Sequence, residues 1–145
     1  LMSKEIIGIA VDHGGFALKQ SVSDEIRANG YDVLDLGTDS EESVDYPDFA
    51  EKLVAAIGRG DVSRGVLICG TGIGISIAAN RHAGIRAALC YDEETACLAR
   101  QHNNANVICM GGRKTDSELA RTMVRLFLET EFEGGRHARR VGKMG

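Results

Sequence analysis

The sequence predicts a single three-layer α/β/α domain: a doubly wound, Rossmann/flavodoxin-like sheet of five parallel strands with helices on both faces. Apolar runs of strand length alternate five times with segments of helical periodicity, and the connections between them are short. The 145 residues fit one domain, without a linker, repeat or low-complexity segment. We therefore expect one domain over residues 1–145, with Leu1 before Met2 a remnant of cloning.

The first half of the chain supplies two strands and two helices. Residues 4–11 are a run rich in Ile and Val, and residues 16–28 carry apolar side chains at helical spacing. Residues 31–36 alternate between apolar and polar side chains, as a second strand does. A polar, acidic loop over 37–45 then leads into a helix that begins near Pro47, which suits a first-turn position.

The second half continues the alternation and ends in a basic segment. The expected elements are a strand at 66–69, a helix from Ile75, a strand at 85–90, a helix from Asp92 to about His102, a strand at 107–110 and a helix over 117–129. Asp92 and Glu93 are interpreted as capping charges of the fourth helix. Residues 133–145 are expected to form a short basic helix or tail.

Two loops of this sheet are candidates for a ligand site. Ligands of doubly wound sheets bind beyond the carboxyl ends of the strands, where the strand order reverses. With the order 2-1-3-4-5, that point lies between strands one and three. The loops there are residues 12–15 and residues 69–74, which are unusually polar or rich in glycine.

The glycine-rich loop has the sequence Cys-Gly-Thr-Gly-Ile-Gly over 69–74 and joins a strand to a helix. Such a turn directs several backbone N–H groups and a helix N-terminus at one anion. It does not follow the first strand, as a dinucleotide fingerprint would, and no Gly-Lys-Ser/Thr follows it, as in a P-loop. We therefore expect a cradle for a phosphate or an oxyanion.

Cys69 begins this loop and has two interpretations. A free cysteine that ends a buried strand is commonly a small hydrophobic residue. The field of the turn would instead stabilise a thiolate and make it a base or nucleophile. A phosphatase mechanism would need an arginine where the chain has Ile75, so a thiolate acting as a base remains.

The other candidates each have a structural alternative. Asp12 and His13 could serve turn geometry as well as catalysis, and His102-Asn103 could close a helix as well as act in acid–base chemistry. The basic cluster over 134–140 could be a solvated tail or a phosphate clamp, joined by Arg113.

Composition narrows the class of partner and the compartment. The net charge of −4 and the pI near 5.6 argue against nucleic acid. No stretch approaches the roughly 18 apolar residues of a membrane span, and no signal peptide is evident. The four cysteines lack CxxC spacing, so we expect reduced thiols, no metal site and a cytoplasmic protein.

Together these residues resemble the ribose-5-phosphate isomerase B family, which includes the galactose-6-phosphate isomerase subunits. The motifs that carry the resemblance span nearly the whole chain in the family's order: Asp12-His13-Gly14-Gly15, Asp45-Tyr46-Pro47-Asp48, residues 69–74, Ala78-Ala79-Asn80, Arg100-Gln101-His102-Asn103, Ala105-Asn106-Val107 and Gly134-Gly135-Arg136-His137. One branch of the family replaces the cysteine and uses a glutamate from the third helix. This chain has Ile75 there and resembles the cysteine branch.

The resemblance implies an aldose–ketose isomerase that acts on a phosphorylated sugar without metal or cofactor, with ribose 5-phosphate and ribulose 5-phosphate as the expected pair. By that resemblance Cys69 moves a proton between C1 and C2, His102 helps to open the ring, and Asp12 and Thr71 contact sugar hydroxyls. The resemblance assigns further residues as follows: ene-diolate stabilisation to the amides of Gly70, Gly72, Ile73 and Gly74; the pocket wall to Tyr46 and Asn103; the phosphate to His13, Arg113, Arg136 and Arg140.

The resemblance also implies a homodimer or tetramer whose sites lie at the subunit interface. We expect residues 102–113 and the basic tail to supply the cross-subunit contributions. Two alternatives stay open: an isomerase of another sugar phosphate (erythrose/erythrulose, allose or galactose phosphate), and a non-catalytic sugar-phosphate-binding module.

Overall fold

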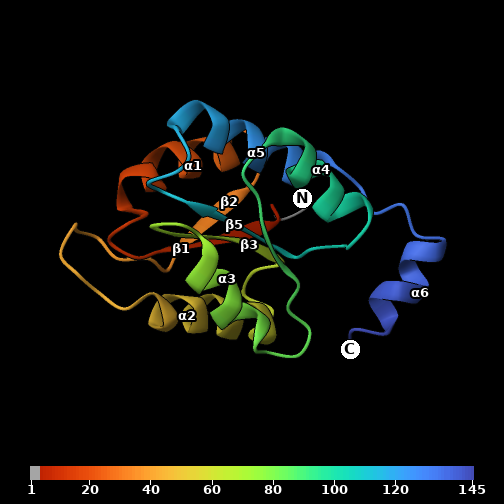
Figure 1. Ribbon diagram of the computed structural model, residues 1–145. Coiled ribbons are helices and arrows are strands. Elements are labelled where there is room, and N and C mark those ends of the chain that lie inside the picture. Colours follow the sequence, from red (N-terminus) through yellow and green to blue (C-terminus); the bar gives the residue numbers. More distant parts are fainter. Residues whose placement is uncertain (1–3) are drawn as a thin grey trace.

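A parallel sheet of five strands forms the middle layer of the computed structural model, which describes residues 4–145 (Figure 1). Leu1, expected to be a cloning remnant, lies outside the described residues. The elements in chain order are β1 (Ile6–Val11), α1 (Phe16–Ala28), β2 (Asp32–Asp35), α2 (Tyr46–Arg59), β3 (Arg64–Cys69), α3 (Ile73–Asn80), β4 (Ala87–Leu89), α4 (Glu93–Gln101), β5 (Val107–Gly111), α5 (Ser117–Glu129) and α6 (Arg136–Gly142). The predicted α/β/α architecture is confirmed.

The strand order is β2-β1-β3-β5-β4, so the expected order 2-1-3-4-5 is wrong in its last two strands. The side chains of Val107, Ile108, Cys109 and Met110 in β5 are fully buried, whereas the three residues of β4 are half-buried. A strand that is apolar on both faces belongs in the interior of a parallel sheet, because helices cover both of its sides. The change leaves the reversal point between β1 and β3 in place.

Helices cover the two faces of the sheet unequally. On one face α1, α4 and α5 pack over Ile7, Ile9 and Ile68, and on the other α2 and α3 pack over Leu67 and Cys69 (Figure 1). Successive side chains of a strand point to opposite faces. The side chain of Cys69 therefore lies on the α2 and α3 side, at the carboxyl end of β3.

The boundaries differ from the expected ones at several places. β1 and β2 are shorter, β4 keeps only three of six expected residues, and β3 begins two residues earlier, at Arg64. α3 begins at Ile73 rather than Ile75, directly after Gly72, whose φ of 81° only glycine adopts without strain. Asp92 caps α4 as expected, because its carboxylate accepts the Thr95 N–H at 2.8 Å.

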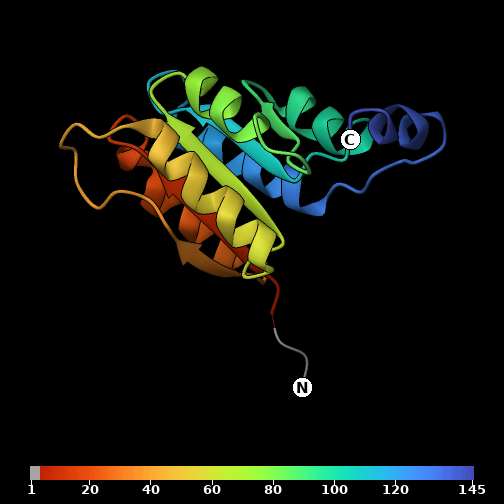
Figure 2. The same ribbon diagram turned by 90° about the horizontal axis from the view of Figure 1, so that it is seen from below.

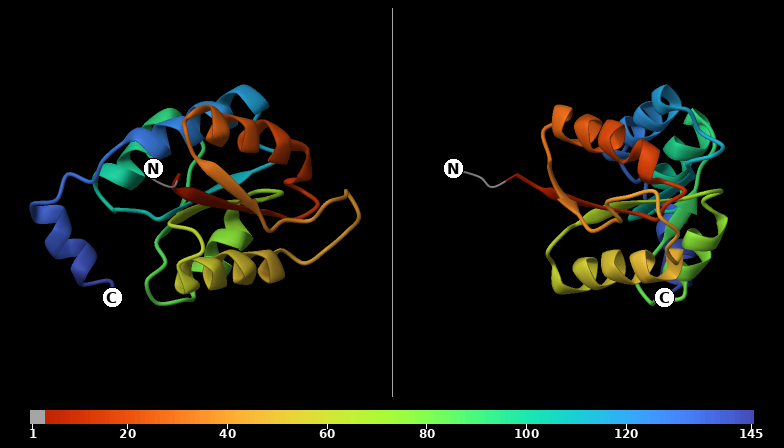
Figure 3. Two further views of the ribbon diagram at one scale, coloured as in Figure 1. Left: turned by 180° about the vertical axis from the view of Figure 1, so that it is seen from behind. Right: turned by 90° about the vertical axis from the view of Figure 1, so that its left-hand side faces the viewer.

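The basic segment forms a short helix at the periphery of the molecule. α6 has no buried residue, and it extends from the end of the domain opposite the 37–45 loop (Figures 1 and 2). Viewed from behind, the same two segments again mark opposite ends (Figure 3). Within residues 4–145, no helix combines the length and the apolar character that crossing a membrane requires.

Candidate active site

Three loops meet at the carboxyl edge of the sheet. The Asp12 N–H donates to the Ile68 carbonyl at 3.1 Å, and the Gly112 N–H donates to the Cys69 carbonyl at 2.8 Å. The backbones approach so closely that a Cβ on Gly14 would lie 2.7 Å from the Gly70 nitrogen. The loops after β1, β3 and β5 therefore pack together as one platform. The sequence predicted that the first two of these loops meet here, and the structure adds the loop after β5.

Asp12 shapes the first of these loops. The residue is only 4 % exposed, and its carboxylate accepts hydrogen bonds from the N–H groups of Gly14 at 2.8 Å and Gly15 at 3.2 Å. This is the turn chemistry that short acidic side chains provide. The structural alternative for Asp12 is thus observed, and the carboxylate also lies at the mouth of the candidate site.

Cys69 lies at the start of the glycine turn with its sulfur directed into it. The Gly72 N–H donates to Cys69 Sγ at 3.2 Å, and the residue is 5 % exposed. The first amides of α3 have no acceptor within their own helix, so they add positive potential at the same place. Thr71 accepts the Ile73 N–H through its hydroxyl at 3.2 Å, which holds the turn in shape.

The remaining thiols differ from Cys69 in their surroundings. Burial raises the pKa of the Cys90 thiol to about 11 and the pKa of Cys109 well above its ordinary value. Both therefore stay protonated at neutral pH and cannot serve as thiolates. Cys97 lies on α4, with the Thr130 hydroxyl 3.9 Å from its sulfur. Cys69 is thus the one thiol placed at the glycine turn.

Two further side chains lie over the glycine turn. A Cβ on Gly74 would lie 2.6 Å from the Tyr46 ring, and a Cβ on Gly70 would lie 2.8 Å from Arg113 Nη1. The Arg113 backbone N–H also donates to the Gly70 carbonyl at 3.0 Å. Because these glycines have no side chain, a phenol ring and a guanidinium can lie directly beside the turn. A guanidinium in this position suits the binding of a phosphorylated ligand.

His13 ties the acidic loop to this platform. Its Nδ1 accepts the Val44 N–H at 3.1 Å, so in the neutral ring Nε2 carries the proton and is free to donate. Lys19 fixes the start of the loop through the Thr38 carbonyl at 2.6 Å and Asp35 at 3.0 Å. The loop over 37–45 is therefore held in a defined position beside the candidate site.

The other predicted site residues lie at the opposite edge. His102 ends α4, which runs from the carboxyl edge back to the amino edge of the sheet. Its imidazole stacks on His137 with ring centroids 4.2 Å apart and planes inclined by 11°. Arg136 and Arg140 lie on α6, at the end of the molecule away from the glycine turn (Figure 1). One chain therefore does not bring Cys69 and His102 together.

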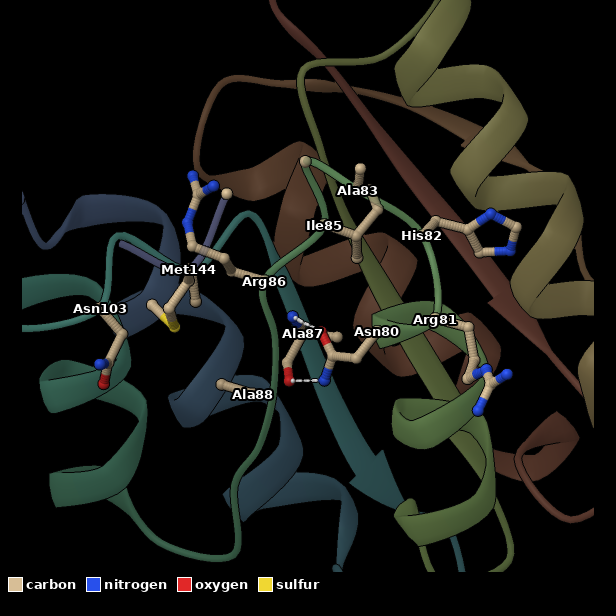
Figure 4. Close-up of a pocket in the computed structure, with 13 residues that line it drawn as sticks. Asn80, Arg81, His82, Ala83, Ile85, Arg86, Ala87, Ala88, Asn103 and Met144 are labelled. Atoms are coloured by element: carbon tan, nitrogen blue, oxygen red, sulfur yellow. Dashed lines mark hydrogen bonds between the residues drawn. The ribbon is translucent and has the colours of Figure 1, made fainter. Parts of the chain in front are cut away.

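Asn103 lies beside a cavity of about 530 Å³ at the same amino edge (Figure 4). The cavity is bordered by the connection from α3 to β4 and by Met144. Asn80 fixes this connection, because its side-chain amide exchanges two hydrogen bonds of 2.8 Å with the backbone of Ala87. After α4, Asn104 has a left-handed backbone, with a φ of 46°.

Two residues that the sequence analysis did not single out lie beside predicted site residues in the structure. The Tyr91 hydroxyl donates to the Thr71 carbonyl at 2.7 Å and supports the glycine turn from the loop after β4. The Glu133 carboxylate lies beside the stacked rings of His102 and His137, near the Nε2 atom of each. Glu133 precedes α6, so no helical spacing marked it in the sequence.

Comparison with known proteins identifies the family of this chain. A family model described as Ribose/Galactose Isomerase matches residues 7–144. Ribose-5-phosphate isomerase B of Escherichia coli is 47 % identical over 135 residues, which cover 93 % of this chain and 91 % of that protein.

Solved structures match along nearly the whole chain. That of Clostridium thermocellum ribose-5-phosphate isomerase B has a TM-score of 0.94 at 51 % identity and covers 97 % of this chain and 95 % of its own. That of the type B ribose 5-phosphate isomerase of Trypanosoma brucei has a TM-score of 0.94 at 43 % identity and covers 98 % of this chain and 97 % of its own. The chain therefore belongs to the ribose/galactose isomerase family.

Proposed function

We propose that this protein is an aldose–ketose isomerase that interconverts ribose 5-phosphate and ribulose 5-phosphate through an ene-diolate. One observation carries the proposal: a single thiol, Cys69, faces a glycine turn at the reversal point of the sheet, with its sulfur accepting the Gly72 N–H. The relatives named as ribose-5-phosphate isomerase B support ribose 5-phosphate as the substrate.

Proton transfer between two carbons needs a base and a way to hold negative charge on oxygen. In the proposal the Cys69 thiolate takes the proton from C2 of the open-chain aldose and returns it to C1. The O2 hydroxyl loses its proton and O1 gains one, so that the carbonyl moves from C1 to C2. Amides of Gly70 and Gly74 stabilise the developing oxyanion, and those of Gly72 and Ile73 join them when the contacts with Cys69 Sγ and the Thr71 hydroxyl rearrange. One such donor is worth about 3 kcal/mol in comparable sites.

The sugar and its phosphate are held by residues around the turn. Asp12 and Thr71 would contact hydroxyl groups, and Tyr46 would cover the sugar. The phosphate does not react, so its binding energy positions C1 and C2 against the base. His13 offers a free Nε2 proton and Arg113 a guanidinium for this anion.

Ring opening requires a second acid–base group, and in the proposal His102 comes from a second copy of the chain. Asn103, Arg136 and Arg140 would arrive with it and complete the pocket and the phosphate clamp. Exposed apolar side chains on and beside α3, namely Ile73, Ile77 and Tyr91, support a partner surface on this side of the molecule. The proposed assembly is a homodimer, or a tetramer built from such dimers, in the cytoplasm.

The test is proton NMR of ribose 5-phosphate in D₂O with catalytic amounts of the protein. Ribulose 5-phosphate should appear with deuterium entering at the exchanging carbon, because the proton that Cys69 takes from the sugar exchanges with solvent before it is returned. Cys69→Ala should lower turnover by about 10³-fold or more while sugar-phosphate binding persists. Unchanged ribose 5-phosphate with a folded protein would defeat the five-carbon assignment, and erythrose, allose and galactose phosphates in the same assay would then distinguish a shifted substrate from a binding module.

A further inference from the structure

One cluster of ligating side chains lies away from the glycine turn. The donor atoms of His102 at the end of α4, Glu133 in the segment before α6 and His137 in α6 all lie within 4.8 Å of one another. Glu133 Oε1 is 3.5 Å from His137 Nε2 and 3.9 Å from His102 Nε2. Within residues 4–145 this is the one group of three histidine, cysteine or carboxylate side chains with such spacing.

We propose that His102, Glu133 and His137 form a binding site for a transition-metal dication of the Zn²⁺ class, and that occupation of this site inhibits the protein. Zinc binds histidine nitrogen and carboxylate oxygen at about 2.0–2.2 Å, so ligand atoms of a tetrahedral site lie about 3.3–3.5 Å apart. The contact between Glu133 and His137 already has this length. The contact to His102 is less than half an ångström longer, and that side chain is 40 % exposed. To ligate the same ion, its ring would turn out of the stack on His137.

The backbone holds the cluster together without a metal. The Glu133 N–H donates to the Gln101 carbonyl at 3.1 Å, which joins the segment before α6 to the end of α4. The Glu133 carboxylate lies beside His137, whose side chain is 12 % exposed. A ligand would therefore meet three donors whose main chains are already positioned, which lowers the entropic cost of binding.

The chemistry of the donors selects the metal. Two imidazoles and one carboxylate, with the fourth position open, suit Zn²⁺, Co²⁺, Ni²⁺ and Cu²⁺, whereas Mg²⁺ and Ca²⁺ prefer oxygen ligands. Burial and the neighbouring His102 lower the pKa of His137, which favours the neutral imidazole that binds metal. Three arginines of α6 oppose a dication, so we expect a dissociation constant of about micromolar rather than nanomolar order.

Occupation would remove His102 from acid–base chemistry, because its Nε2 lone pair would bind the metal. The inhibitory part of this inference rests on the proposed function, in which His102 opens the sugar ring. The binding part does not, since it depends only on the three side chains.

The test begins with the full-length protein freed of metal by a chelator and titrated with Zn²⁺ in competition with a coloured chelator. One Zn²⁺ should bind per chain, and Glu133→Gln and His137→Gln should each weaken binding by at least about tenfold. Glu131→Gln is the matched control, because it removes the same charge two residues away and should leave the affinity unchanged. Circular dichroism of the metal-free variants checks that each is folded.

Three results would overturn the inference: no binding at about millimolar Zn²⁺, equal binding by all variants, or a thiolate charge-transfer band when Co²⁺ replaces Zn²⁺. The last would assign the metal to cysteine. In a protein that isomerises ribose 5-phosphate, Zn²⁺ should inhibit and the chelator should restore the rate, with Glu133→Gln less sensitive than Glu131→Gln. Site-specific binding without inhibition would refute the inhibitory role. A folded protein without isomerase activity would refute the proposed function, and the metal titration would still decide whether the site exists.

Discussion

Two inactive variants should restore activity to each other if the active site is shared between two chains. The carboxyl edge holds Cys69, and the amino edge holds His102. β3 spans six residues, Arg64–Cys69, at a rise of about 3.3 Å per residue, so the two edges lie about 17 Å apart. A proton donor must approach to about 3 Å, which excludes cooperation between these two side chains within one chain.

The assay uses Cys69→Ala and His102→Gln chains carrying different affinity tags, co-expressed and purified as the mixed dimer. One of its two sites would combine the intact Cys69 with the intact His102, and the other would lack both. The mixed dimer should therefore have about half of the wild-type activity per dimer, although each variant alone is nearly inactive. The control pairs wild type with the Cys69→Ala/His102→Gln double variant, which leaves each site with one missing group.

The two arrangements give opposite results in these dimers. A shared site predicts recovery in the first dimer and near-complete loss in the second. A site within one chain predicts no recovery in the first and about half activity in the second. Purified mixed dimers without recovery would refute the shared site, whatever the activity of the wild type.

Three further perturbations follow from single contacts. Gly74→Ala should raise KM several-fold with a smaller change in kcat, since a Cβ 2.6 Å from the Tyr46 ring displaces the mobile end of that side chain, as steady-state kinetics would measure. Leu53→Ala should lower the free energy of unfolding by about 2–5 kcal/mol in denaturant titrations, because this fully buried side chain would leave a cavity. Stability should fall by up to about 1.4 kcal/mol per pH unit between about pH 9 and 11 through Cys90, whose thiol ionises first in the unfolded chain, and Cys90→Ala should flatten this slope.

Each of these has a matched comparison. Gly58→Ala lies in α2 with open space at its Cβ, so it should leave KM unchanged and raise stability slightly; an equal KM effect at both glycines would contradict the Tyr46 argument. Ile77→Ala removes an exposed side chain, so a loss of monomer stability as large as that of Leu53→Ala would argue against the cavity account. An identical alkaline slope in wild type and Cys90→Ala would refute the burial argument.

Much of the fold could be predicted from local patterns. The alternation of apolar strands with amphipathic helices determines a parallel sheet, and glycines after β3 and β5 mark where backbones approach closely. The order of β4 and β5 could not be predicted this way, because it depends on which strand is apolar on both faces in the assembled sheet. A run of three or four apolar residues looks the same in either position.

The candidate site divides in the same manner. Local patterns establish that a thiol and a glycine turn end one strand, that an aspartate and a histidine end its neighbour, and that the chain carries a basic tail. Asp12 closes its turn through the N–H groups of Gly14 and Gly15, which are local contacts. Packing of the whole domain makes His13 hold the 37–45 loop and places His102 with Glu133 and His137 at the far edge. The residue at which each strand ends depends on its neighbours along the chain, so a local sequence pattern can predict it. The distance between two loops depends on how all the strands and helices pack, so no local sequence pattern can predict it.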